Sequence, residues 1–217
     1  MLKAVLFDLD GVLVDSHYLH YKSWKMLAEY LKLELTQTQA DAFRGMAREE
    51  CMRVMFEEFN HQKAPNFSEI NRLTTMKNDW YLDILNNAQQ DELVLPGAIE
   101  LLEELNKKGV RSLVASGSKN AKQVIECAKL SAYFYDVIDR HDIKNTKPDP
   151  EIFLLALKRS EANANEVVGV EDALLGIESL KAANLKSIGI GEYANTADLH
   201  LKNIQELNYE LMCNLLN

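Results

Sequence analysis

The chain has 217 residues, of which 47% are hydrophobic and 26% are charged, so it has the composition of an ordinary globular protein. Its length fits one compact domain, or one core domain that carries a smaller insertion. Its 24 basic and 33 acidic residues give a formal net charge of −9, which argues against nucleic acid or an anionic membrane as the partner.

The first predicted element is a short buried strand at residues 3–7, an apolar run that ends abruptly in Asp8, Leu9, Asp10 and Gly11. Asp8 and Asp10 are two positions apart, so in extended backbone both side chains point to the same side. Two adjacent carboxylates repel each other, and a divalent cation relieves this repulsion. The same residues also fit a polar turn, because Asp and Gly are common in turns.

The next segment, from Asp15 to about Ala88, is rich in helix-forming residues and shows no convincing strand. The spacing of four residues near its start places them on one helical face: His20, Trp24, Leu27 and Leu31. Further helices are predicted over residues 48–59 and 68–85. The simplest interpretation is a helical domain at residues 16–92, inserted after the first strand, with a core domain at residues 1–15 and 93–217.

Strands and helices alternate in the rest of the chain. Short apolar runs predict strands at residues 112–115, 167–170 and 187–190. Amphipathic stretches predict helices at 97–108, from about 119, after Pro150, at 173–183 and at about 203–217. This alternation predicts an α/β fold with a Rossmann-like parallel sheet and helices on both faces, in addition to the all-helical insertion. Ligands of such sheets bind at the carboxyl ends of the strands.

The sequence also predicts where the protein resides. No apolar run approaches the ~20 residues needed to cross a bilayer, and Asp8 and Asp10 interrupt the only apolar segment near the N-terminus. The cysteines are odd in number, widely spaced and without a Cys-x-x-Cys pair: Cys51, Cys127 and Cys213. They are expected to be reduced, structural thiols of a cytoplasmic protein.

Polar residues follow three of the later predicted features. Ser116 follows the strand at 112–115, Lys147 precedes Pro148 just before a helix, and Glu171 and Asp172 follow the strand at 167–170. Taken singly, each has an ordinary structural explanation, such as a helix cap, a solvated loop lysine, or acidic residues at a helix start. Their order and their positions at strand ends favour a shared active site with Asp8.

These residues carry a resemblance to a known family. The string from Phe7 to Ser16 resembles the first motif of the haloacid dehalogenase superfamily of phosphotransferases, and the family's other three motifs follow in order at Ser116, Lys147 and Glu171–Asp172. Within it, the chain is most similar to the β-phosphoglucomutase group, over essentially its whole length. The further matches are His20, Trp24, residues 44–49, residues 77–79 and residues 116–120.

The resemblance implies a role for each core residue. Asp8 would be the nucleophile that forms an aspartyl-phosphate, and Asp10 the general acid and base. Ser116 and Lys147 would hold the transferring phosphoryl group. An all-oxygen ligand set implies Mg²⁺ as the cofactor, held by Asp8, the Asp10 carbonyl and Asp172. Glu171 would bind the ion through a water or position the other ligands.

The resemblance also assigns residues to the sugar phosphate and to cap closure. Arg48, Ser118 and Asn120 would grip the second phosphate, and an arginine suits this because its planar fork binds phosphate oxygens bidentately. His20 and Lys77 would couple closure to Asp10. The remaining substrate-binding residues implied are Trp24, Gly45 and Lys119.

The implied reaction interconverts β-D-glucose 1-phosphate and glucose 6-phosphate through a bisphosphate intermediate, in a monomer that binds a small phosphorylated sugar. The alternative is a Mg²⁺-dependent sugar-phosphate phosphatase with the same core motifs. Arg48 and the Ser118–Asn120 pair favour the mutase, whereas Ala47, which stands where the group usually has a small hydroxyl residue, favours the phosphatase. A catalytically inactive relative would lack one of the core carboxylates or Lys147, and all are present.

Overall fold

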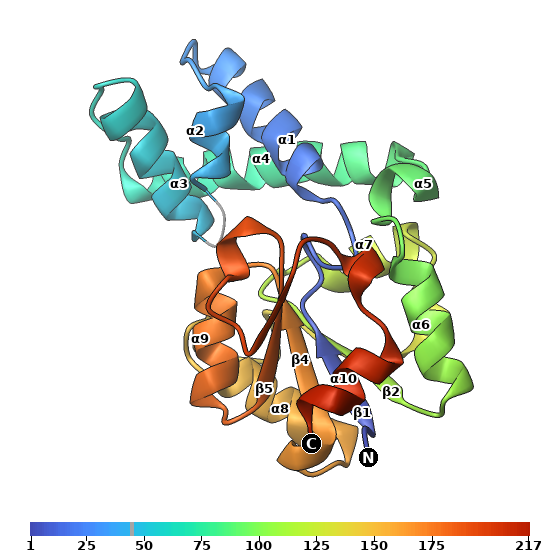
Figure 1. Cartoon of the computed structure of the whole chain (residues 1–217). Helices are drawn as coiled ribbons and strands as arrows, with labels where there is room; N and C mark the ends of the chain where they lie inside the picture. Colours follow the sequence, from blue (N-terminus) through green and yellow to red (C-terminus); the bar gives the residue numbers. More distant parts are fainter. Residues whose placement is uncertain (44–45) are drawn as a thin grey trace. The chain divides into compact units, whose positions relative to one another are not determined.

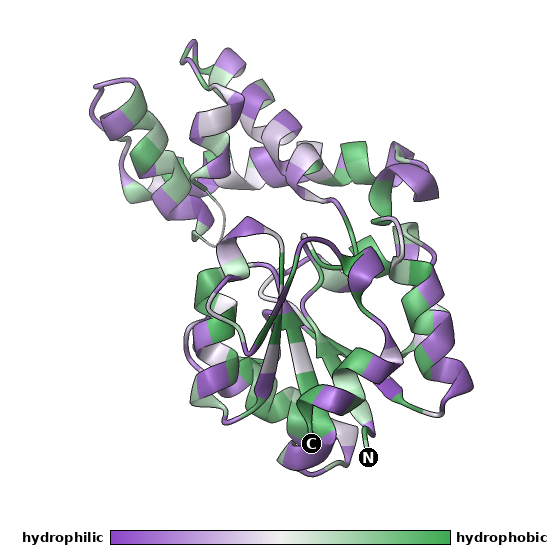
Figure 2. Ribbon diagram, in the orientation of Figure 1, coloured by the Kyte–Doolittle hydropathy of each residue, from purple (hydrophilic) through white to green (hydrophobic). Residues whose placement is uncertain are grey.

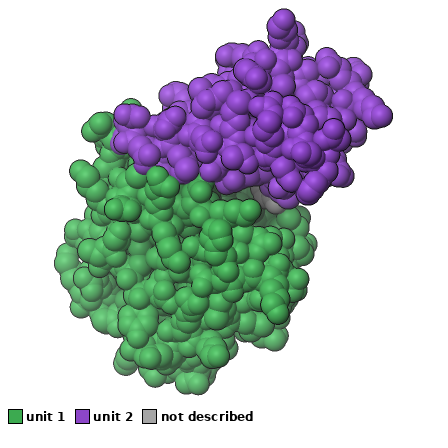
Figure 3. Space-filling model, turned by 180° about the vertical axis from the view of Figure 1, so that it is seen from behind, with its two compact units in different colours: residues 1–15, 89–217 green, residues 16–88 purple. Residues whose placement is uncertain are grey.

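The computed structural model describes residues 1–43 and 46–217, which form two compact units (Figures 1 and 3). Unit 1 comprises Met1–Asp15 and Gln89–Asn217, and unit 2 comprises Ser16–Ala88. The predicted insertion at residues 16–92 would also include a short helix, α5 (Gln90–Leu93), that lies in unit 1.

Unit 1 contains a six-stranded sheet in the order β3-β2-β1-β4-β5-β6, and every pairing is parallel. The strands are β1 (Ala4–Phe7), β2 (Arg111–Ala115), β3 (Phe134–Ile138), β4 (Val167–Glu171), β5 (Lys186–Ile190) and β6 (Leu199–Leu201). The helices of unit 1, besides α5, are α6 (Ala98–Lys107), α7 (Ala121–Cys127), α8 (Glu151–Ser160), α9 (Leu174–Ala182) and α10 (Tyr209–Leu215), with 3₁₀ turns at Ser131–Tyr133, Ala164–Glu166, Glu192–Ala194 and Ile204–Glu206.

The central strand β1 is apolar because both of its faces are covered. Its four residues are fully buried, and Figure 2 shows the hydrophobic colouring of β1 and of its neighbour β4. Ala4 and Leu6 pack with Phe153 of α8 and Leu180 of α9 in one apolar cluster. Side chains alternate along a strand, so Val5 and Phe7 face the opposite side, where α6 packs on β2 and α10 packs on α6. The predicted fold of a parallel sheet between helices is confirmed.

The register of the sheet sets the position of the functional residues. Phe7 of β1 pairs with Val114 of β2 on one side and with Val170 of β4 on the other. The residues that follow these three positions therefore meet at the carboxyl edge of the sheet. This places Asp8 between the ends of β2 and β4.

Unit 2 is entirely helical in its described part. Its elements are α1 (His17–Tyr30), α2 (Gln37–Asp41), α3 (Arg48–Val54) with a π-helical turn at Met55–Phe59, and α4 (Phe67–Asn87). The longest helix, α4, begins after Asn66, whose side chain accepts a hydrogen bond from Glu69 N at 3.0 Å. The predicted apolar face of α1 is largely correct, since Trp24 and Leu27 are buried, and they pack with Leu73 of α4 and Met52 of α3.

Several elements were not predicted. The strands β3 and β6 lie at the two edges of the sheet and carry polar residues, so they lack the continuous apolar run of a central strand. The short helices α2 and α5 were missed as well, and the helix expected over 203–217 is confined to Tyr209–Leu215. None of the helices in the described ranges is both long enough and apolar enough to cross a membrane.

Candidate active site

The loop after β1 presents Asp8 at the sheet edge. Asp8 N donates to Val170 O at 2.8 Å, which continues the β1–β4 pairing one residue beyond the strand. The chain then turns sharply at Gly11, where φ is 84°, and Gly11 N donates to Val14 O at 2.8 Å. A residue with a side chain is disfavoured at this φ, so glycine allows the turn that leaves the Asp8 carboxylate at the strand end.

Lys147 is the centre of the charged cluster. Its amine lies 2.5 Å from Asp8 Oδ1 and 2.5 Å from Glu171 Oε1, and it donates to the carbonyl of Ala115 at 3.0 Å. A lysine ammonium has three N–H donors, so each of them has an acceptor here. The side chain is 14% exposed, and its partners Asp8 and Glu171 are 12% and 2% exposed. Lys147 therefore joins the ends of β1, β2 and β4.

The electrostatics of this cluster follow from burial and from unequal charge. Burial disfavours the ammonium of Lys147, but the carboxylates of Asp8 and Glu171 outweigh it and raise the pKa of Lys147 above its ordinary value. Burial also raises the pKa of Asp8 well above its usual range, against the attraction of Lys147, and Glu171, Asp172 and Asp10 raise it further. One ammonium thus faces several carboxylates. The cluster therefore has excess negative charge, which favours the binding of a further cation.

Glu171 is held by backbone as well as by Lys147. Its Oε2 accepts hydrogen bonds from Asp172 N at 3.0 Å and from Ala173 N at 3.2 Å. Gly176, the third residue of α9, makes this possible, because a Cβ at that position would lie 1.9 Å from the Glu171 carboxylate. Glycine at 176 is therefore a requirement for the position of Glu171, and its spacing from the Glu171–Asp172 pair is a signal that the sequence prediction overlooked.

A divalent cation fits this site. Asp8, Glu171 and Asp172 each offer a carboxylate oxygen, and these oxygens lie within 4.8 Å of one another. Hard cations such as Mg²⁺ prefer oxygen ligands. In the part of the chain that the structure describes, no other group of three or more Asp, Glu, His or Cys residues has its possible ligand atoms this close together.

The loop after β2 carries three of the predicted phosphate-binding residues. Ser116 is buried, and its Oγ accepts a hydrogen bond from Ser118 N at 3.1 Å. Ser118 Oγ in turn accepts from Asn120 N at 3.1 Å. Each of these bonds spans two residues and forms a local turn, and Lys119 in this loop is exposed. Ser116 follows β2 and Asp8 follows β1, and these two strands are neighbours in the sheet.

The predicted residues of unit 2 form a second cluster. Lys77 of α4 is buried, and its amine lies 2.9 Å from Nδ1 of His20 on α1. Burial and the nearby Arg48 lower the pKa of Lys77 to about 7. Burial, together with Lys77, Arg48 and His17, lowers the pKa of His20 well below its usual range. Both groups are therefore less basic than their free counterparts.

Arg48 and Trp24 occupy different environments from one another. Arg48 is the first residue of α3, where Ala47 provides no side-chain cap for the helix start. Trp24 is 4% exposed and packs against Phe43 in the apolar core of unit 2. The predicted substrate-binding residue Gly45 lies outside the described residues.

Lys77 provides a test of the energetic cost of this arrangement. Replacing Lys77 with methionine, which has a similar volume, is expected to stabilise the protein at pH 6, because a buried cation is removed. The pKa of Lys77 is lower in the folded than in the unfolded chain, so the unfolded state binds more protons between about pH 7 and pH 10, and wild-type stability rises with pH in this window. The gain of Lys77→Met over wild type should therefore shrink by about 1.4 kcal/mol per pH unit in that window. Urea unfolding at pH 6, 8 and 9.5 measures this difference, and parallel curves would contradict the assigned burial of the amine.

Some of the predicted residues thus come together in two clusters, one in each unit. Asp8, Glu171 and Lys147 are in direct contact, and the carboxylate oxygens of Asp8, Glu171 and Asp172 converge. His20 and Lys77 are in direct contact within unit 2. Sequence reasoning missed Tyr81, whose ring stacks on His20 with centroids 4.3 Å apart.

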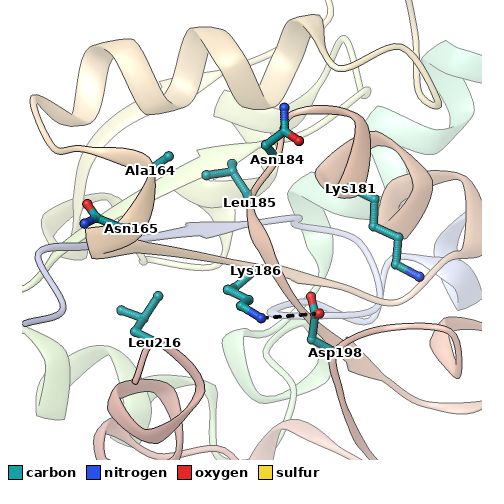
Figure 4. Close-up of a pocket in the computed structure, with 8 residues that line it drawn as sticks. All are labelled: Ala164, Asn165, Lys181, Asn184, Leu185, Lys186, Asp198 and Leu216. Carbon is teal, nitrogen blue, oxygen red and sulfur yellow. Dashed lines mark ion pairs between the residues drawn. The ribbon is translucent and has the colours of Figure 1, made fainter.

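A hollow of about 470 Å³ lies elsewhere on unit 1, at the amino ends of β4 and β5 (Figure 4). Its two amines are already engaged. Lys186 pairs with Asp198 at 3.7 Å, and Lys181 donates to the carbonyl of Thr196. It contains none of the predicted site residues.

Comparison with known proteins defines the class. The family model described as haloacid dehalogenase-like hydrolase matches residues 5–190, so the chain belongs to this family. The fold and the site agree with an enzyme of its phosphatase and phosphoryl-transfer type.

Two groups of relatives are similar to the chain. The β-phosphoglucomutase of Bacillus subtilis (strain 168) is 29% identical over 213 residues, which cover 97% of this chain and 94% of the relative. The phosphorylated carbohydrates phosphatase of Thermotoga maritima is 28% identical over 190 residues, covering 86% and 84%. Among solved structures, β-phosphoglucomutase from Clostridium difficile superposes with a TM-score of 0.88 at 31% identity, and the match covers 100% of this chain and 98% of that one.

Proposed function

We propose that this chain is a β-phosphoglucomutase that interconverts β-D-glucose 1-phosphate and glucose 6-phosphate. The observation that carries the proposal is the buried Asp8 carboxylate at the end of β1, held at 2.5 Å by Lys147 and accompanied by the carboxylates of Glu171 and Asp172. Similarity to a mutase over nearly the whole length of both chains supports the choice of reaction.

Asp8 is the nucleophile in this proposal. Its free carboxylate oxygen attacks the phosphorus of the sugar phosphate, and the bond between phosphorus and the sugar oxygen breaks. Asp10 donates a proton to that departing oxygen, and in the reverse transfer it removes a proton from the accepting hydroxyl. Lys147 and Ser116 stabilise the negative charge of the transferring group.

The carboxylate oxygens of Asp8, Glu171 and Asp172 lie within 4.8 Å of one another and would suit Mg²⁺. Asp8, Asp172 and the Asp10 carbonyl would hold the ion, and Glu171 would act through water or by positioning the other ligands. When bound, the ion would neutralise charge on the phosphoryl oxygens. The residues of the chain provide the rest of the positioning. Lys147 keeps Asp8 and Glu171 in place, and the backbone N–H groups of Asp172 and Ala173 hold the other Glu171 oxygen.

A mutase must also hold the second phosphate of the bisphosphate while the first is transferred. We assign this to Arg48 of unit 2 and to Ser118, Lys119 and Asn120 in the loop after β2. Unit 1 is then the catalytic core and unit 2 its cap, in which Trp24, Gly45, His20 and Lys77 shape the substrate side. The proposed enzyme is a cytoplasmic monomer.

The second candidate is a sugar-phosphate phosphatase, in which water accepts the phosphoryl group from Asp8. Ala47 favours it, because this residue provides neither a side-chain cap for α3 nor a hydroxyl for a ligand. The similarity to a phosphorylated carbohydrates phosphatase also favours it.

Product analysis separates the two candidates. Purified protein is incubated with Mg²⁺, β-glucose 1-phosphate and a trace of glucose 1,6-bisphosphate, and glucose 6-phosphate and free phosphate are measured in parallel. Glucose 6-phosphate with little free phosphate supports the mutase. Free phosphate as the main product contradicts it and supports the phosphatase.

Replacing Arg48 with alanine is expected to reduce mutase kcat/KM by roughly 100-fold, the upper range for losing a charged hydrogen bond to phosphate. A matched control exists on the same helix. Arg53 is exposed and lies 3.9 Å from Glu50, and Arg53→Ala should leave the rate within about twofold, because such exposed pairs contribute little. Equal rates for Arg48→Ala and wild type would contradict the assigned role of Arg48.

A further inference from the structure

Aromatic rings enclose the Lys77 amine in unit 2. Lys77 Nζ lies 4.8 Å from the centroid of the Trp24 ring and 5.2 Å from that of the Tyr81 ring. Both distances are within the ~6 Å range of cation–π attraction. Tyr81 also stacks on the imidazole of His20, with centroids 4.3 Å apart and planes inclined by 12°. One ring, Tyr81, therefore contacts both members of the His20–Lys77 pair.

The charged groups around Lys77 give it no anionic partner. Arg48 faces it from α3 and lowers its pKa after burial, His20 faces it from α1, and the buried thiol of Cys51 also faces it from α3. Within the described ranges, no carboxylate lies within salt-bridge distance of Lys77 or contributes to its pKa. The ring faces of Trp24 and Tyr81 are thus the negative surfaces that stabilise this cation.

The hydrogen bond between Lys77 and His20 has a direction. Below its pKa of about 7, Lys77 is protonated and has only donors, so in that pH range His20 Nδ1 accepts. Burial and its cationic neighbours keep His20 neutral, because they lower its pKa well below the usual range. A neutral imidazole that accepts at Nδ1 carries its proton on Nε2. Whatever keeps Lys77 charged and in place therefore also fixes the tautomer of His20.

We propose that Tyr81 and Trp24 are positioning residues, whose rings hold the Lys77 ammonium against His20 Nδ1 and so keep the His20 proton on Nε2. The inference rests on the proposed function insofar as His20 and Lys77 serve phosphoryl transfer. In that reaction, His20 has its N–H donor fixed on Nε2. If both tautomers were populated, part of the binding energy would be spent in selecting the correct one on each turnover.

The test reads the tautomer directly. The full chain is labelled with ¹⁵N-histidine, and the His20 ring nitrogens are observed by NMR at pH 6 without substrate. Three changes at position 81 are compared: Tyr81→Phe, which keeps the ring, a fluorinated phenylalanine, which keeps its shape but weakens the negative face, and Tyr81→Leu, which removes the ring. Trp80→Leu is the matched control, because the Trp80 ring on the same helix contacts Tyr30, at 6.1 Å.

The expected result is an Nε2-protonated His20 in wild type and in Tyr81→Phe, and a mixture of tautomers in Tyr81→Leu. The fluorinated variant should lower the midpoint of the Lys77 titration relative to Tyr81→Phe, and kcat/KM of Tyr81→Leu should fall about tenfold, the effect of one buried cation–π contact. Trp80→Leu should retain the wild-type tautomer.

An unchanged tautomer in Tyr81→Leu would overturn the proposal, as would equal Lys77 titrations in the fluorinated variant and Tyr81→Phe. The comparison of the fluorinated variant with Tyr81→Phe tests the proposal even if Tyr81→Leu does not fold. If wild type converts no sugar phosphate, the proposed function fails, whereas the comparison of tautomers still stands.

Discussion

Replacing Asp8 with asparagine is expected to abolish turnover, with a loss of at least about 10⁴-fold in kcat, as for other enzymes that lose a covalent nucleophile. The reason is chemical rather than structural. Asparagine occupies the same volume at the end of β1, but its amide oxygen is a poor nucleophile and cannot form the aspartyl-phosphate. Steady-state rates with β-glucose 1-phosphate, and phosphoprotein detection by mass spectrometry after incubation with the bisphosphate, measure both consequences.

The control for this change is Asp15→Asn, in the same loop but exposed, which should keep turnover within about twofold because a surface substitution of this kind is nearly neutral. A phosphorylated Asp8→Asn protein would show that another residue receives the phosphoryl group. Substantial turnover by Asp8→Asn would rule out Asp8 as the nucleophile.

Lys147→Met is expected to lower both stability and activity. Without the ammonium, the carboxylates of Asp8 and Glu171 remain buried at 12% and 2% exposure with no counter-charge. Removing one partner of a buried ion pair typically costs about 3–5 kcal/mol. The melting temperature should therefore fall in EDTA, and added Mg²⁺ should restore more of it in the variant than in wild type, because the cation takes over part of the missing charge.

Lys144→Met is the matched control, since Lys144 precedes the same motif but is exposed. It should melt like wild type in EDTA and in Mg²⁺. A Lys147→Met protein with wild-type stability in EDTA would show that Lys147 does not compensate the two carboxylates. Equal restoration by Mg²⁺ in the variant and in wild type would argue against a cation at the same cluster.

The sequence was most informative where burial is complete. The strands β1 and β4 are apolar throughout and were predicted within a residue or two, because a parallel strand covered on both faces leaves little room for polar residues. At the edges this rule fails. β3 contains Asp136, whose carboxylate pairs with Arg159, and β6 exposes His200, so neither strand shows an apolar run. The edge strands could be assigned only from their pairing partners.

The same limit applies to the site. Asp8 and Glu171 were predicted because each lies in a motif at a strand end, and Lys147 because it lies in a motif just before a helix. Tyr81 was missed, because an aromatic residue on an amphipathic helix looks the same whether it packs in a core or stacks on a histidine. The contact between His20 and Lys77 joins residues 57 positions apart, and only the resemblance, not the spacing, pointed to the two together.

The position of β1 in the sheet has a consequence for biosynthesis. β1 is the first strand of the chain, yet it lies between β2 and β4, which begin at Arg111 and Val167. When β1 leaves the ribosome, neither of its partners has been made. Its apolar residues therefore remain unpaired until most of the chain has been synthesised. The helices of unit 2 are complete by Asn87, and their apolar core lies within residues 24–73. We expect unit 2 to fold during synthesis and the sheet to form only after β4 emerges. Between these two events, the chain most needs protection from aggregation.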